Sequence, residues 1–274
     1  MHLSFTKMHG LGNDFIVFES PADAIIPASV YRRLADRRTG IGFDQALVLE
    51  PARRAGTDVF YRIFNADGSE VEQCGNGARC IAWLVSRQRN LGDQVHMDSA
   101  GGLVHATIRS DGQVSIDMGV PNFDPKSLPF DAAVQSQWYA LHAAGRDLQI
   151  GVVSMGNPHA VLLVDDVNTA PVDTVGPAVQ NHLRFAQRVN VGFMQIVDRE
   201  HVRLRVFERG AGETLACGTG ACAAVAVGRL RGALAESVQV ALPGGLLRID
   251  WQGSGQSLWM TGPVQIAFQG TVEL

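Results

Sequence analysis

Two short segments of the sequence place a cysteine directly before a glycine-rich stretch. They are EQCGNGARC, residues 72–80, and LACGTGAC, residues 215–222. If a helix begins at each stretch, its first N–H groups are unpaired and its dipole is positive, which favours a thiolate and lowers the thiol pKa. Glycines beside the cysteine let the same backbone approach a carboxylate closely. The pattern therefore predicts two sites that each combine a base, Cys74 or Cys217, with an anion-binding helix start.

The two segments belong to a longer internal repeat. A constant shift of 143 residues, the separation of Cys74 from Cys217, also places Arg62 on Arg205. The same shift places Leu103 on Leu246, and no insertion interrupts it. Because only two copies occur at so long a period, a solenoid is excluded. The repeat predicts two copies of one architecture.

Each copy has the pattern of a strand, a glycine-rich loop, a helix and a hairpin. The strands are expected at 58–66 and 201–209, the helices at 78–88 and 221–231, and the hairpins at 95–108 and 238–251. The second helix is apolar on every side for two turns and should be buried. The expected fold class is α+β, with two strand-rich lobes, each wrapped around a central helix. If the lobes face each other, the two cysteines flank one bound carboxylate.

Composition narrows the class of protein. The chain has 274 residues, 46% of them hydrophobic and 18% charged, and a net charge of -4. These values predict a soluble two-domain protein and argue against nucleic-acid binding. The chain has neither an apolar run of ~18 residues nor an apolar signal-peptide core, so we expect no membrane association and a cytoplasmic location. Four cysteines are too few for a disulfide scaffold in a chain of this length.

Cysteines at these positions are also compatible with other chemistries. We expect Cys80 and Cys222, inside the predicted helices, to be ordinary buried thiols. Zinc sites usually pair cysteines at a C-x2–4-C spacing, and the gaps here, five and four residues, run along a loop and a helix, so no metal is expected. The segment GTGACA, 218–223, fits the dinucleotide fingerprint G-x-G-x-x-A, but that motif alone is weak evidence, and no clear acidic residue ends a strand about 20 positions on. Neither Lys7 nor Lys126 has a setting for pyridoxal phosphate, and no cofactor is expected.

Several longer motifs resemble one family. They are KMHGLGNDF, GFDQ, RIFNADGSEVEQCGNGARC, VSMGNPH, NVGFMQ and ERGAGETLACGTGACA, and together they extend over essentially the whole chain. The sequence resembles the diaminopimelate epimerases, cofactor-independent enzymes that interconvert LL- and meso-2,6-diaminopimelate for lysine and peptidoglycan-precursor biosynthesis. The resemblance implies that Cys74 and Cys217 are paired bases, one a thiolate while the other is a thiol.

The resemblance also implies roles for the residues around the cysteines. The reacting carboxylate would bind the backbone N–H groups of Gly75, Asn76, Gly218 and Thr219. The other implied substrate contacts are Asn13, Gln45, Asn65, Asn157, Asn190, Glu208 and Arg209. His159 and Glu208 are implied to tune the two thiol pKa values. Asp14 and Asp44 lie in the motifs but are expected to cap turns.

The family's organisation supplies further expectations. It implies pseudo-symmetric lobes at 1–118 and 119–262, a C-terminal segment 263–274 that crosses back to the first lobe, an active site between the lobes, and a homodimer. A proline or hydroxyproline racemase would keep the two thiols but should lack a charged clamp such as Glu208 and Arg209. A non-catalytic thiol or metal-binding protein would not need a symmetric pair of cysteines.

Overall fold

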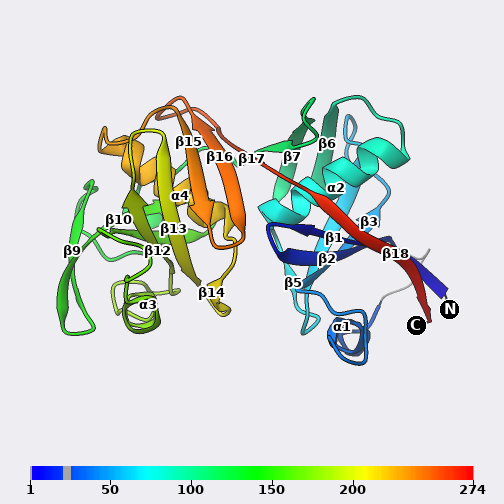
Figure 1. Cartoon of the computed structure of the whole chain (residues 1–274), viewed down its shortest axis with the longest axis horizontal. Helices are drawn as coiled ribbons and strands as arrows, with labels where there is room; N and C mark the ends of the chain where they lie inside the picture. Colours follow the sequence, from blue (N-terminus) through cyan, green and yellow to red (C-terminus); the bar gives the residue numbers. More distant parts are fainter. Residues whose placement is uncertain (1, 21–25, 274) are drawn as a thin grey trace. The chain divides into compact units, whose positions relative to one another are not determined.

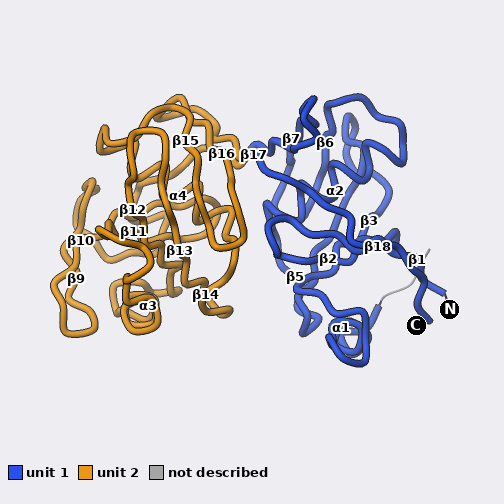
Figure 2. Tube along the Cα trace, viewed as in Figure 1, with its two compact units in different colours: residues 1–117, 261–274 blue, residues 118–260 orange. Residues whose placement is uncertain are grey.

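A computed structural model of the chain describes residues 2–20 and 26–273 (Figure 1). The chain divides into two compact units (Figure 2). Unit 1 is Met1–Asp117 with Thr261–Leu274, and unit 2 is Met118–Met260. Strands outnumber helices in both units, which confirms the predicted strand-rich α+β class.

Unit 1 is built on a mixed sheet. Its strands are β1 (His2–Gly10), β2 (Asn13–Glu19), β3 (Gln45–Glu50), β4 (Val59–Asn65), β5 (Glu70–Val71), β6 (Gln94–Ser99), β7 (Gly102–Ile108), β8 (Val114–Asp117) and β18 (Gln265–Glu273), and its helices are α1 (Ala28–Ala35) and α2 (Gly75–Gln88). Strand β2 is antiparallel to β1 and parallel to β3, β4 is antiparallel to β3 and parallel to β6, and β6, β7 and β8 form a meander. The last strand, β18, pairs antiparallel with β1, so the end of the chain completes this unit.

Unit 2 repeats these pairings. Its elements are η1 (Pro125–Ser127), β9 (Tyr139–Ala143), β10 (Arg146–Ser154), β11 (Pro158–Leu163), α3 (Val172–Gln180), β12 (Asn190–Ile196), β13 (His201–Glu208), β14 (Gly212–Thr214), α4 (Gly218–Leu230), β15 (Ser237–Leu242) and β16 (Gly245–Trp251), and β17 (Leu258–Gly262) begins in unit 2 and ends in unit 1. The order β10, β11, β12, β13, β15, β16 has the same parallel and antiparallel pairings as β1, β2, β3, β4, β6, β7. The counterpart of β18 is β9, which pairs with β10.

The paired glycines turn the two predicted hairpins. Strands β6 and β7 end their ladder at Ser99 and Gly102, and β15 and β16 end theirs at Leu242 and Gly245. Gly102 has a φ of 111° and Gly245 a φ of 137°, a region that side-chain-bearing residues rarely adopt. Tight two-residue turns of this kind fix the register of both hairpins.

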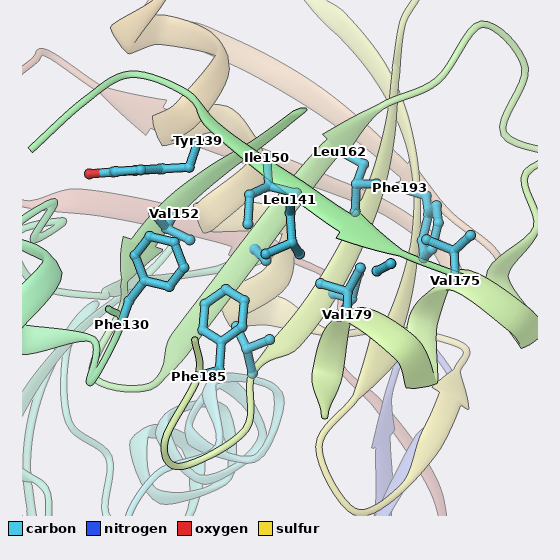
Figure 3. Close-up of a cluster of buried hydrophobic side chains, with 14 of the residues drawn as sticks. Phe130, Tyr139, Leu141, Ile150, Val152, Leu162, Val175, Val179, Phe185 and Phe193 are labelled. Carbon is cyan, nitrogen blue, oxygen red and sulfur yellow. The ribbon is translucent and has the colours of Figure 1, made fainter. Parts of the chain in front are cut away.

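A hydrophobic core lies between the strands and helix α3 of unit 2 (Figure 3). Val175 and Val179 of α3 pack there with Leu141 of β9 and Ile150 of β10. Helix α4 is buried along most of its length, as its apolar sequence predicts. Among the described residues, no helix is long and apolar enough to cross a membrane.

Candidate active site

The strand topology of unit 1 brings three predicted amide side chains to one edge of its sheet. Asn13 begins β2, Gln45 begins β3 and Asn65 ends β4. Because β2 is parallel to β3 and β4 is antiparallel to it, these three strand ends share one edge. Gln45 and Asn65 are register partners, and Gln45 Nε2 donates to Asn65 Oδ1 at 2.9 Å.

Unit 2 uses the corresponding positions. Asn157 immediately precedes β11, Asn190 begins β12 and Glu208 ends β13. The first register pair of β11 and β12 is His159 with Asn190, as Phe15 with Gln45 is for β2 and β3. Arg209 follows β13 directly.

Both predicted cysteines stand at the junction between loop and helix. Cys74 is the extended residue before Gly75, the first residue of α2, and Cys217 precedes Gly218 in α4 in the same way. The carbonyl oxygens of the two cysteines accept the first helical hydrogen bonds. Each helix therefore begins directly after its cysteine, as predicted. That the N–H groups of its first turn bind a carboxylate stays a prediction.

In unit 1, Cys74 contacts a network of amides. Its Sγ lies 3.7 Å from Asn13 Oδ1, which also accepts from Asn76 Nδ2 at 3.3 Å. Asn76 Oδ1 in turn accepts from Arg79 Nη2 at 3.0 Å. The structure thus joins Cys74, Asn13 and Asn76 in one cluster, and it adds Arg79, to which the sequence analysis assigned no role.

Asp14 and Asp44 do more than cap turns, so that expectation was incomplete. Each carboxylate accepts the other residue's backbone N–H, which joins the starts of β2 and β3. Arg37 bridges both carboxylates, and the buried ammonium of Lys7 pairs with Asp14. Burial raises the pKa of Asp14, but hydrogen bonds from Arg37 and Lys7 outweigh it and hold that pKa at about 2. Asp44 also accepts a hydrogen bond from Asn13 Nδ2 at 2.9 Å. The cluster of charged side chains therefore holds Asn13, a residue that is predicted to bind the substrate.

In unit 2, Cys217 lies in a different electrostatic setting. Only 4% of the residue is exposed, and its Sγ lies 3.6 Å from Thr219 Oγ1. Burial raises the pKa of Cys217 well above its usual value, and the carboxylate of Glu208 raises it further. The helix start by itself would lower the pKa of the Cys217 thiol. Loss of hydration and a nearby negative charge both oppose the thiolate, and here they dominate.

His159 is fully buried and held through one amide. Its Nε2 lies 2.9 Å from Asn157 Oδ1, so the imidazole donates and the amide oxygen accepts. Burial lowers the pKa of His159 to about 3, with a smaller contribution from the positive charge of Arg209. The imidazole is therefore neutral at physiological pH. Its implied tuning of a thiol stays a prediction.

The charged pair at the end of β13 is also held by neighbours. The hydroxyl of Thr214, another residue without a role in the sequence analysis, donates to Glu208 Oε1. The backbone N–H of Arg209 donates to Asn190 Oδ1 at 2.8 Å, and its exposed guanidinium donates to the Gln187 carbonyl at 3.0 Å. Thr214 pairs with Val206 on β13, and this long-range register gives no signal in the local sequence.

The two remaining cysteines are buried inside their helices, as predicted. Cys80 and Cys222 are 0% exposed, and burial raises the pKa of the Cys80 thiol to about 12. Within residues 2–20 and 26–273, no group of three or more His, Cys, Asp or Glu side chains is placed to hold a metal ion.

The sequence matches a known family over most of its length. The family model for diaminopimelate epimerase matches residues 5–123 and 151–267. The chain belongs to the diaminopimelate epimerase family. Among its relatives, the diaminopimelate epimerase of Nitrosomonas eutropha is 56% identical over 281 aligned residues, with all of both chains covered. The diaminopimelate epimerase of Nitrosomonas europaea is 54% identical, again with full coverage of both.

More distant enzymes share the fold. A solved hydroxyproline epimerase from Agrobacterium vitis, with trans-4-hydroxy-L-proline bound, aligns with a TM-score of 0.69 and 17% identity. The alignment covers 99% of this chain and 92% of that one. At this identity the likeness concerns the fold alone, and membership of the diaminopimelate epimerase family rests on the closer relatives.

Proposed function

We infer that this chain is an isomerase that interconverts LL- and meso-2,6-diaminopimelate in lysine biosynthesis. The observation that carries this function is the full-length identity of 56% to a diaminopimelate epimerase. In support, both Cys-Gly-x-Gly-Ala segments form helix starts, each with its cysteine at the junction. Such an arrangement supplies a base and a carboxylate seat without a cofactor.

The proposed chemistry uses the two thiols on opposite faces of the reacting carbon, in a site between two pseudo-symmetric lobes. One cysteine, as thiolate, takes the α-proton and becomes a thiol, and the electron pair of the broken C–H bond is held on the carbon and its carboxylate. The other cysteine, as thiol, delivers its proton to the opposite face and becomes the thiolate. Configuration is inverted, no redox change occurs, and the reverse reaction exchanges the roles.

The raised pKa of Cys217 supports a starting assignment for these roles. A thiol whose pKa lies well above its usual value is protonated near neutral pH. In the proposal, Cys217 therefore carries its proton when the substrate binds. Glu208 raises the pKa of Cys217 and so helps to keep its proton until the carbanion forms.

The remaining site residues are proposed to bind the two amino-acid ends of the substrate. The N–H groups at Gly75, Asn76, Gly218 and Thr219 take the reacting carboxylate. Arg209 suits the distal carboxylate, because a guanidinium forms two parallel hydrogen bonds to it, and Glu208 suits an ammonium. The amides of Asn13, Gln45, Asn65, Asn157 and Asn190 can serve either kind of group.

Two further parts of the proposal concern the whole molecule. The enzyme is proposed to be a cytoplasmic homodimer whose lobes correspond to residues 1–118, with the crossing segment 263–274, and 119–262. Leu274 and Met1, at the ends of these ranges, lie outside the described residues. Sedimentation of the purified protein would measure the oligomeric state directly.

Isotope exchange tests the function. LL-Diaminopimelate incubated with the enzyme in D2O should gain deuterium at the reacting α-carbon and yield the meso form, and iodoacetamide should abolish both. Proline, hydroxyproline and lysine serve as comparators under the same conditions. Racemisation of proline or lysine as fast as diaminopimelate is epimerised would overturn the assignment and favour the broader racemase class.

A further inference from the structure

A chain of amide hydrogen bonds in unit 1 is fixed at both ends by charged groups. At one end, the carboxylate of Asp44 accepts from Asn13 Nδ2 at 2.9 Å. At the other end, the guanidinium of Arg79 donates to Asn76 Oδ1 at 3.0 Å. Between them, Asn76 Nδ2 donates to Asn13 Oδ1 at 3.3 Å. An ionised carboxylate only accepts and a guanidinium only donates, so the two ends dictate which way both amides point.

The polarity of this chain determines what Cys74 meets. With Nδ2 of Asn13 bound to Asp44, its Oδ1 is the atom that lies 3.7 Å from Cys74 Sγ. A thiol can donate to that oxygen. An amide turned the other way would present N–H to the sulfur, which suits a thiolate instead.

Arg79 is an unusual residue for the interior of a helix. It is 0% exposed, and a guanidinium stays charged at any physiological pH, so its burial is costly. Its Nη2 lies 3.0 Å from where a Cβ on Gly10 would stand, so the end of β1 is shaped to admit it. The corresponding position in α4 holds Cys222, so the repeated architecture itself does not require an arginine there.

Unit 2 orients the equivalent amide in the opposite sense. Asn157 corresponds to Asn13, and its Oδ1 is bound to the imidazole of His159, at 2.9 Å. Its Nδ2 therefore faces the helix start and donates to Thr219 Oγ1 at 3.4 Å. Two equivalent asparagines thus present opposite ends because their anchors differ: a carboxylate in unit 1 and an N–H donor in unit 2.

We propose that Asp44 and Arg79 are positioning residues. They hold the amide of Asn13 so that its oxygen faces Cys74 Sγ and the bound substrate. Asn13 then offers the substrate an acceptor and selects an ammonium, whereas Asn157 offers a donor and selects a carboxylate. This inference rests on the proposed catalytic role of Cys74. Its main readout, thiol reactivity, is independent of turnover.

The first test is Asp44→Asn, which removes the charge that fixes the Asn13 end of the amide chain. Asp44 is half-exposed, with 44% of its side chain accessible, so the variant should fold. We expect kcat/KM on diaminopimelate to fall about tenfold or more, as for loss of a hydrogen bond to a charged group. In the free enzyme, the freed amide can turn its N–H to the sulfur, and the rate of Cys74 alkylation by iodoacetamide, followed by peptide mass spectrometry, should rise severalfold.

The same protein carries its own controls. Cys80, buried in the same helix, reports loosening of unit 1, and Cys217 reports general effects on reactivity. Asp36→Asn is the matched variant, because Asp36 is an exposed carboxylate that caps its own turn. It should leave both kcat/KM and the Cys74 rate within about twofold.

Arg79→Lys and Arg79→Met provide the second arm. Lysine keeps a donor for Asn76 Oδ1 and should retain much of the turnover, whereas methionine should not. The proposal is overturned if Asp44→Asn leaves the Cys74 rate unchanged, or if Cys74 and Cys80 become reactive together. Retained turnover after Cys74→Ala would instead refute the catalytic role, so the two failures are distinguishable.

Discussion

Units 1 and 2 build the same helix start but surround its cysteine with groups of different charge. Around Cys74 lie neutral amides, an ion cluster at Asp14 and Asp44, and the buried Arg79. Cys217 instead lies near the carboxylate of Glu208 and is more deeply buried than Cys74. Unit 2 has Glu208 as the last residue of β13 and Arg209 directly after it. The shift of 143 residues that joins Cys74 to Cys217 places Asn65 and Ala66 at these positions in unit 1.

The difference separates what the repeat preserves from what it varies. The backbone N–H groups that are proposed to bind a carboxylate are present twice, because a helix start supplies them whatever the side chains are. The side chains that are proposed to distinguish an ammonium from a carboxylate differ between the units. In the proposed reaction one end of the substrate reacts and the other end only binds, and unequal side chains suit these two tasks.

Removal of either cysteine should have the largest effect. We expect Cys74→Ala and Cys217→Ala each to lower kcat by about 10²–10⁴-fold or more, because one thiol can remove a proton but cannot supply the opposite face. Steady-state assays of epimerisation measure this. Cys222→Ala is the matched control and should keep its turnover in the folded fraction. Near wild-type turnover by either active-site variant would end the two-base assignment.

Replacement of the distal clamp should be the next largest effect. Arg209→Lys keeps the charge but loses the planar two-bond fork, and charge-assisted bonds contribute about 1.5–3 kcal/mol each. We expect kcat/KM on diaminopimelate to fall about tenfold to a few hundredfold. Arg203→Lys, on the exposed face of the same strand, is the control. An equal effect of both substitutions would assign Arg209 to stability rather than to the substrate.

Removal of the carboxylate beside Cys217 should sharpen the electrostatic difference. Glu208 raises the pKa of Cys217, so Glu208→Gln should lower that pKa and increase the thiolate fraction. We expect alkylation of Cys217 at pH 8 to accelerate by about three- to tenfold, at one decade per pKa unit. Glu213→Gln, which removes a carboxylate paired with Arg205, is the matched control. No acceleration in Glu208→Gln would leave burial as the sole cause of the raised pKa.

The smallest expected effect concerns stability in acid. The pKa of His159 is about 3 in the folded unit, compared with an unperturbed value of 6.5. The neutral, buried imidazole therefore contributes its full stability to the fold above pH 6.5, and this contribution is lost as the pH falls toward 3. Between pH 7 and pH 5 the loss should be about 2 kcal/mol. His159→Phe introduces the residue type that Phe15 has at the equivalent position of unit 1. In this variant, the free energy of unfolding measured in urea should no longer show this decrease between pH 7 and pH 5. His142→Phe, at an exposed histidine, should keep the decrease. An equal dependence of the unfolding free energy on pH in the native protein and both variants would contradict a buried neutral imidazole at His159.

Much of the local architecture could be predicted from the sequence. The paired glycines at 101–102 and 244–245 predicted both hairpins, and the second glycine of each pair has a φ that few other residues adopt. The apolar segment at 221–231 predicted a buried helix. Both helices begin three residues earlier than the expected ranges, at Gly75 and Gly218, directly after the two cysteines. These features depend on neighbours in the chain, so the order of residues is sufficient to determine them.

Only the tertiary structure decided how the side chains at those positions behave. That Arg79 is buried, that Asp44 anchors Asn13 across 31 residues, and that burial reverses the expected pKa shift of Cys217 depend on segments distant in sequence. Helix α3 even contains Pro177, a residue that local rules place outside helices. The sequence by itself determined where each cysteine would meet a helix start, because propensity and spacing are local. The solvation and orientation of each charged group are sums over surrounding atoms that only the folded chain brings together.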